Sequence, residues 1–225
     1  MSIAQIIGNY DNPTSLGSKF RRRRSAPLKH MIEGVFVEKS AVSILDVGGM
    51  KYYWDMFPKE FLAAHKVKIT LLNLIDDIRP IKRPEFLEAY EGDGCALPFP
   101  NDHFDICHSN SVIEHVGNWH RKVSFAHEMT RVAPHYFHQT PNFWFPWKPH
   151  FGMPIYHWLP DPVKLSIARR RKMGWWQRAD TVMDGMIRVE HASLLNRHMM
   201  TCLFPQARLV EERFLGMTKS FVAVR

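Results

Sequence analysis

In the stretch ILDVGGM, residues 44–50, an apolar strand runs directly into two glycines. The apolar half, 44–47, is typical of a parallel strand that is buried on both faces of its sheet. Gly48 and Gly49 then let the backbone come close to a neighbouring group or ligand. A strand that ends in this way predicts a Rossmann-like α/β fold. The GxGxxG spacing of a dinucleotide site is absent, because residues 50–52 are Met, Lys and Tyr.

Strands and helices are predicted to alternate on both sides of this stretch. Further strands are predicted at 69–72, 86–90, 104–110 and 136–139, and an antiparallel pair at 207–214 and 219–224. Helices are predicted at 18–36, 54–65, 118–132 and 191–202, with an irregular connection at 76–85. The sequence therefore predicts an α/β, Rossmann-like sheet that is mostly parallel and closes with a C-terminal antiparallel strand. We expect a single domain over 1–225, with an N-terminal helical segment over 1–40.

Polar residues stand where two of these strands end. Asn73 follows the second strand, where an amide can bind ribose hydroxyls because it both donates and accepts hydrogen bonds. Asp93 follows the third strand, where its carboxylate could accept a hydrogen bond from an adenine amino group beside the backbone of Gly94 and Cys95. A turn residue is an equally good interpretation of Asp93.

Three segments together resemble a known family. They are ILDVGG at 44–49, GDGCALPFPNDHFD at 92–105 and SNSVIEHV at 109–116, in the family's order and spacing. On these segments the chain resembles the class I methyltransferases, specifically the type 11 methyltransferase domain, over about its first two thirds. The resemblance implies the class I fold and S-adenosylmethionine as the cofactor. It implies almost nothing about the methyl acceptor.

The resemblance also implies a set of cofactor residues. The expected set is Asp46, Gly48, Gly49 and Met50 beside the methionyl part, Asn73 and Leu74 at the ribose, Asp93, Gly94 and Cys95 at the adenine, and Asn110 and Ser111 at the methionine end. Two departures stand out: Met50 and Tyr52 replace glycines that are common in the family's first loop, and Asn73 replaces its acidic ribose ligand.

Two histidines are candidate catalytic groups. Displacement at a sulfonium methyl needs orientation and exclusion of water, without a covalent intermediate. An oxygen or nitrogen acceptor must also lose a proton, and His115 is the leading base because a near-neutral pKa suits that task. A structural imidazole bonded to a backbone carbonyl is the alternative interpretation. His150 is the second candidate, and no metal site is predicted.

The segment after the fifth strand should control substrate choice. Residues 140–162 contain six prolines among many aromatic residues, which excludes a regular helix or a central strand. We expect an aromatic and proline-rich lid over 140–175 that overhangs the cofactor pocket and encloses an acceptor. The alternative is a surface that touches a membrane, because Trp and Tyr favour headgroup depth.

Composition limits the possible partners. The chain has 225 residues, 45% of them hydrophobic, and a net charge of +8. Two basic runs, Arg21 to Arg24 and Arg169 to Lys172, could face an anionic partner or be solvated helix faces. The first run could reach the acceptor pocket. The second run can simply end a helix, because cations are favoured at helix C-termini. Three cysteines without a paired motif, no signal segment and no membrane span indicate a cytoplasmic protein, with membrane association left open.

Three classes of function remain. The favoured one is a methyltransferase acting on an oxygen or nitrogen atom of a small-molecule, glycan or lipid-linked acceptor. A nucleic-acid methyltransferase is less favoured, because SNSV at 109–112 lacks the NPPY or DPPY signature of many base-modifying enzymes. A non-catalytic or membrane-docking relic of the fold is the third class.

Overall fold

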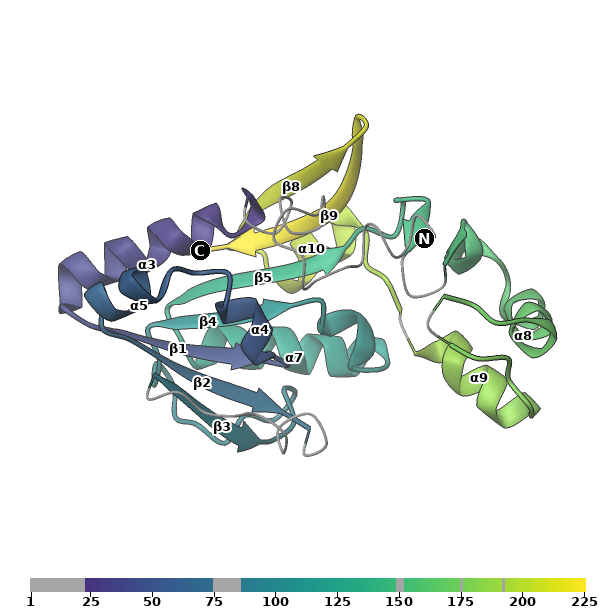
Figure 1. Ribbon diagram of the computed structural model, residues 1–225, viewed down its shortest axis with the longest axis horizontal. Coiled ribbons are helices and arrows are strands. Elements are labelled where there is room, and N and C mark those ends of the chain that lie inside the picture. The colour runs from purple at the N-terminus through teal and green to yellow at the C-terminus, as the bar shows by residue number, and fades with distance from the viewer. Residues whose placement is uncertain (1–22, 75–85, 149–151, 175, 192) are drawn as a thin grey trace.

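The computed structural model describes residues 23–74, 86–148, 152–174, 176–191 and 193–225. Its main sheet has seven strands in the order β3-β2-β1-β4-β5-β9-β8 (Figure 1). The strands are β1 Val42–Val47, β2 Val67–Asn73, β3 Leu87–Glu91, β4 Ile106–Asn110, β5 His135–Pro141, β8 Arg208–Phe214 and β9 Met217–Val224. The first five are parallel, and β9 runs antiparallel to both β5 and β8. The predicted Rossmann-like sheet with an antiparallel C-terminal end is confirmed.

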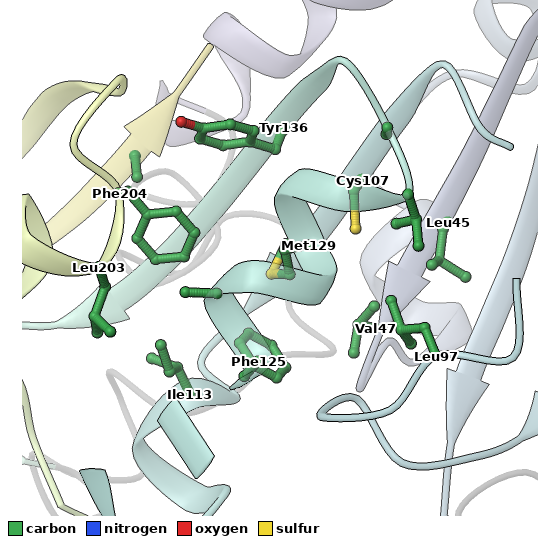
Figure 2. Close-up of a cluster of buried hydrophobic side chains, with 14 of the residues drawn as sticks. Leu45, Val47, Leu97, Cys107, Ile113, Phe125, Met129, Tyr136, Leu203 and Phe204 are labelled. Carbon is green, nitrogen blue, oxygen red and sulfur yellow. The ribbon is translucent and has the colours of Figure 1, made fainter. Parts of the chain in front are cut away.

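Helices cover both faces of the sheet (Figure 1). One face carries α3 Ala26–Lys39, α4 Lys51–Trp54 and α5 Lys59–Ala64, and the other carries α7 Trp119–Arg131 and α10 Arg197–Leu203. Figure 2 shows the core under α7, where Phe125 and Met129 meet Leu45, Val47 and Cys107 of the sheet. Burying a side chain of this size contributes about 1.5–3 kcal/mol each. This packing fixes the carboxyl ends of β1 and β4, where the candidate site lies.

Several predicted helices have different bounds. The predicted helix over 18–36 corresponds to α3, which ends later, at Lys39, and residues 18–22 lie outside the described part of the chain. Pro27 stands in the first turn of α3, which suits proline because the first helical N–H groups need no partner. The predicted helix over 54–65 is shorter, because Pro58 is the N-cap of α5, and α4 already ends at Trp54. Helix α10 begins later than predicted, after Asn196, whose side chain accepts the amide of Met199.

The segment after β5 is only partly irregular. It contains the short antiparallel pair β6 Trp147–Lys148 and β7 Met153–Pro154, then a single 3₁₀ turn at 156–158. Helices α8 Asp161–Arg170 and α9 Val182–Glu190 follow, and α9 was not predicted. The two helices pack against each other as a lobe at one end of the molecule (Figure 1). The second basic run does end a helix, as expected.

No helix in the described part of the chain is both long and apolar enough to cross a bilayer.

Candidate functional site

The diglycine turn after β1 is closely packed. Gly48 has a φ of +70° and donates its N–H to the Leu72 carbonyl at 2.7 Å. A Cβ built on Gly48 would lie 2.4 Å from a Val112 methyl, and one on Gly49 would lie 2.0 Å from the carboxylate of Asp46. Both glycines are therefore required by contacts within the chain, whether or not a ligand also approaches their backbone.

Asp46 lies in the interior below this turn. Its Oδ2 accepts the indole N–H of Trp54 at 2.7 Å, and its Oδ1 is 2.6 Å from Nδ1 of His108. All three side chains are buried. Asp46 thus connects β1 to α4 and β4, and both its oxygens are already engaged with protein groups.

Asn73 ends β2, as predicted, and connects it to the same turn. Its amide N–H group donates to the Gly49 carbonyl at 3.2 Å and approaches the Met50 sulfur at 3.7 Å. Its carbonyl oxygen accepts the Leu74 N–H at 2.9 Å, while the Leu74 side chain is exposed. The structure therefore brings Asn73, Gly49, Met50 and Leu74 together.

Asp93 carries an ion pair that the sequence analysis missed. One Arg121 nitrogen, Nη2, lies 2.9 and 2.8 Å from the two Asp93 oxygens, and the Cys95 amide donates to Oδ1 at 2.9 Å. Partial burial would raise the pKa of Asp93, but these donors outweigh it and lower the pKa. Oδ1 has two partners and Oδ2 has one, so Oδ2 keeps a lone pair that can accept an amino group.

Arg121 also reaches the segment after β4. Its Nε donates to the Val116 carbonyl at 2.7 Å, so one guanidinium connects the Asp93 turn with the chain beside His115. The first turn of α7 gave no local signal for this contact, because Arg121 and Asp93 are 28 residues apart.

Gly94 and Cys95 follow Asp93 with different roles. A Cβ on Gly94 would lie 2.7 Å from a Val47 methyl, so this glycine permits close packing on the core. The Cys95 thiol donates to the Arg121 carbonyl at 3.3 Å, and partial burial raises its pKa to about 11. The thiol is therefore neutral near pH 7, and Cys95 is unsuited to act as a nucleophile.

The carboxyl end of β4 contains a buried acceptor that has no partner among the described residues. Ser111 has a φ of +60°, and its N–H and hydroxyl both donate to Gln139 of β5 at 2.9 Å. Asn110 keeps its buried Oδ1 without a hydrogen bond to any described residue. An unpaired buried acceptor is costly, so this atom fits a site that receives a donor from a ligand.

His115 sits in a 3₁₀ turn, Ile113–His115, after β4. Its Nδ1 lies 2.7 Å from the carbonyl of His191, which fixes the N–H on Nδ1 and the lone pair of the neutral ring on Nε2. Nε2 is 3.8 Å from Oε1 of Glu114, a buried carboxylate whose other oxygen accepts the Thr140 hydroxyl at 3.0 Å. His115 thus has the carbonyl partner expected of a structural imidazole, and a buried carboxylate stands near its other ring nitrogen.

A cavity of about 470 Å³ lies next to this turn. Its walls come from the start of α7, from the segment after β5 and from α8 and α9: Gly117, Asn118, Phe143, His157, Asp161, Lys164, Val189, Glu190, Ser193 and Leu194. His150, the second candidate base, lies outside the described residues. Four residues of the predicted lid segment, Phe143, His157, Asp161 and Lys164, therefore line a cavity, together with residues of α9, a helix that was not predicted.

The first basic run differs from expectation. Arg24 pairs with Glu212 of β8 at 3.3 Å, and both side chains are about nine-tenths buried. Strand β8 forms one edge of the sheet, and β3 forms the opposite edge. Arg24 therefore does not enter the cavity beside His115, and Arg21 and Arg22 lie outside the described residues.

Comparisons with known proteins agree with this geometry. Residues 61–134 match the family described as "Methyltransferase domain". A search of curated proteins found no match.

Among the solved structures that are similar to this chain are three with a TM-score of 0.52. One, a SAM-dependent methyltransferase from Methanosarcina mazei, is 14% identical, with 83% of this chain and 92% of that chain covered. Another, a protein from Pyrococcus horikoshii, is 13% identical, with 90% and 89% covered. The third, from a complex of a Haloferax volcanii methyltransferase activator with a putative methyltransferase, is 12% identical, with 98% and 92% covered. The chain therefore has the fold of these methyltransferases, residues 61–134 match a methyltransferase domain, and the cofactor that these findings support is S-adenosylmethionine.

Proposed function

We propose that the protein transfers a methyl group from S-adenosylmethionine to an oxygen or nitrogen atom of a small-molecule, glycan or lipid-linked acceptor. The observation that carries the proposal is the row of acceptor atoms at the carboxyl ends of neighbouring strands. Asn73 ends β2, Asp93 follows β3 with an available lone pair, and Asn110 ends β4 with an unpaired oxygen. Ligands of open α/β sheets bind at this edge.

These residues suit the parts of the cofactor. Asp93 Oδ2 would accept the adenine amino group, Asn73 and Leu74 would flank the ribose, and Asn110 Oδ1 would accept from the methionyl ammonium. When bound, the sulfonium supplies an electrophilic methyl group. We assign Asp46 a bracing role below the turn, because Trp54 and His108 already occupy its oxygens. The remaining candidates, Gly48, Gly49, Met50, Gly94, Cys95 and Ser111, would shape the walls of the site.

His115 would take the proton that the acceptor loses. The His191 carbonyl holds the ring so that Nε2 is the basic atom, and Glu114 would stabilise the imidazolium as its charge develops. No nucleophile on the protein is needed, because the acceptor itself attacks the methyl group. His150 stays a second candidate for the base.

The cavity beside His115 would hold the acceptor. Its volume, about 470 Å³, is within the range of small-ligand sites, and its walls mix apolar and polar groups. Asp161 and Glu190 line it, and its one lysine, Lys164, is already paired with Asp161 at 3.0 Å. Because the Lys164–Asp161 pair has no net charge, Glu190 leaves the cavity lining with a negative charge, which favours a compact acceptor over the dense row of phosphates in nucleic acid.

Calorimetric titration with S-adenosylhomocysteine tests cofactor binding first. Asp93→Ala should weaken binding by about 1–3 kcal/mol, because one hydrogen bond to a buried amino group is lost. Glu60→Ala, which removes an exposed carboxylate of α5, is the matched control. Absence of heat with the unaltered protein would instead support the non-catalytic relic.

Transfer of labelled methyl groups to a panel of acceptors tests catalysis. His115→Gln should slow turnover by about 10²–10⁴-fold while S-adenosylhomocysteine affinity changes little. His120→Gln, an exposed histidine of α7, is the control. Normal turnover of the His115 variant would assign the base to another group.

A further inference from the structure

Helix α9 carries an apolar face that nothing in the described chain covers. The side chains of Met183 and Ile187 are 73% and 59% exposed, and residues four apart share one side of a helix. Gly185 and Val189 are buried on the opposite side, against the rest of the lobe. The exposed pair therefore projects away from the protein.

The same lobe carries unpaired positive charge. Three of its cations have acidic partners: Lys164 with Asp161, Arg178 with Asp180 and Arg188 with Asp184. The cations at the end of α8 are Arg169, Arg170, Arg171 and Lys172, and all four are exposed. None of these four forms an ion pair with a described residue, so the lobe holds a local excess of positive charge.

The basic end of α8 packs against the side of α9 opposite the exposed apolar pair. A Cβ built on Gly185 would be 3.6 Å from Cγ of Arg169 and 2.4 Å from a Leu165 methyl, so the end of α8 packs directly on α9. Gly185 lies halfway along α9 between Met183 and Ile187. The separation between Arg169 and the exposed apolar pair is therefore that of one helix diameter, roughly 10 Å. Figure 1 shows α8 and α9 together, away from the sheet.

Exposed tryptophans lie in the segment that leads to this lobe. Trp144 and Trp158 are both exposed, and their ring centroids are 6.3 Å apart. Tryptophan prefers the interface between water and lipid, where its ring is shielded and its N–H stays bonded. The Trp158 N–H already donates to the Phe143 carbonyl at 2.7 Å, so its ring can enter such an interface without an unpaired donor.

We propose that the α8–α9 lobe docks on the surface of a bilayer that contains anionic lipid. Met183 and Ile187 would enter the headgroup region while Arg169 to Lys172 contact lipid phosphates, the combination that binds an amphipathic helix in the interface. Lys164 and Asp161 of α8 and Val189 and Glu190 of α9 also line the acceptor cavity, so docking brings that cavity to the membrane. The placement of the acceptor cavity at the membrane rests on the proposed function. Among the proposed acceptors, it favours a lipid-linked one.

Co-sedimentation of the full chain with vesicles tests docking directly. The protein should bind vesicles of phosphatidylcholine mixed with phosphatidylglycerol, and bind phosphatidylcholine alone much more weakly. M183E/I187E should reduce binding by about tenfold or more, because two charges would enter the headgroup boundary. V37E is the matched control, because Val37 is an exposed apolar residue of α3, 84% exposed, outside the lobe. R169Q/R170Q should reduce binding and its sensitivity to salt.

Three outcomes would overturn the proposal. Absence of binding to anionic vesicles is the first. Binding that persists in M183E/I187E and is competed by RNA would make the lobe a purely electrostatic, nucleic-acid surface. A dimer in light scattering that M183E/I187E converts to a monomer would assign the apolar face to a second copy. S-adenosylhomocysteine titration of the same samples keeps a failure of docking separate from a failure of the proposed function.

Discussion

Asp46→Asn separates a bracing role of this residue from a direct contact with the cofactor. Asn has one acceptor oxygen and an NH₂ group where Asp has two acceptors. The Trp54 indole can only donate, so the Asn oxygen must face it, and the NH₂ group then faces Nδ1 of His108. His108 must move its proton to Nε2 to accept, and buried Nε2 has no partner among the described residues.

The cost follows from these contacts. The hydrogen bond between His108 and a charged carboxylate becomes one between neutral groups, and one N–H becomes buried without a partner, which together cost about 2–3 kcal/mol. For a chain of 225 residues this lowers the melting temperature by roughly 4–12 °C. Trp54→Phe removes the other bond to Asp46 and should cost about 1.5–3 kcal/mol. Because both variants act on one carboxylate, their effects should not add.

Denaturant unfolding and S-adenosylhomocysteine titration, run on both variants, check this reasoning. If Asp46 has the bracing role, Asp46→Asn should lose much stability and less affinity for S-adenosylhomocysteine. Trp54→Phe should show the same two losses, since the turn at Gly48 shifts in both variants. Full stability with a strong loss of affinity in Asp46→Asn alone would refute it, and would place the carboxylate against the cofactor.

Three further variants probe other contacts. Arg121→Gln should change stability by less than about 1 kcal/mol, because its ion pair is half exposed, yet weaken S-adenosylhomocysteine binding about fivefold in calorimetry by releasing Asp93. Burial and the nearby His108 lower the pKa of His138 to about 3 in the folded protein. In the unfolded chain, histidine has a pKa of about 6.5 and binds a proton below that pH, which favours unfolding. Unfolding titrations should therefore show about 2 kcal/mol of stability lost between pH 7 and pH 5. His138→Leu should remove that loss; an unchanged pH dependence would contradict the assignment. Gly48→Ala should cost about 2–4 kcal/mol through its positive φ and its clash with Val112, and Val112→Ala should restore part of it in thermal unfolding.

The sheet could be predicted because its signals are local. The buried run of β1 and the polar residues at the ends of β2 and β4 mark their positions within a few residues of sequence. Helix α9 could not be predicted in this way. Gly185 interrupts it at a cost of about 1 kcal/mol relative to alanine, and the reason appears only in three dimensions, where Leu165 of α8 occupies the space of the missing side chain.

The candidate site was predictable as a location but less so as a set of contacts. Asp46, Asn73, Asp93 and Asn110 follow or end the expected strands, yet their partners come from distant parts of the chain. His108 is 62 residues from Asp46, and Arg121 is 28 residues from Asp93. A pattern of residue types can indicate that a carboxylate stands at a strand end, but not which donors have already reached it.

The departure at Asn73 has a physical reason in these contacts. The resemblance implies a carboxylate at this position, but a carboxylate has no N–H and could not donate to the Gly49 carbonyl, as Asn73 does at 3.2 Å. Val112 fills the space above Gly48, and Asp46 supports Gly49 from below. The turn is thus held on three sides by the protein itself. A turn fixed before the cofactor arrives loses little conformational entropy on binding, which would offset the weaker hydrogen bonds of a neutral amide to the ribose.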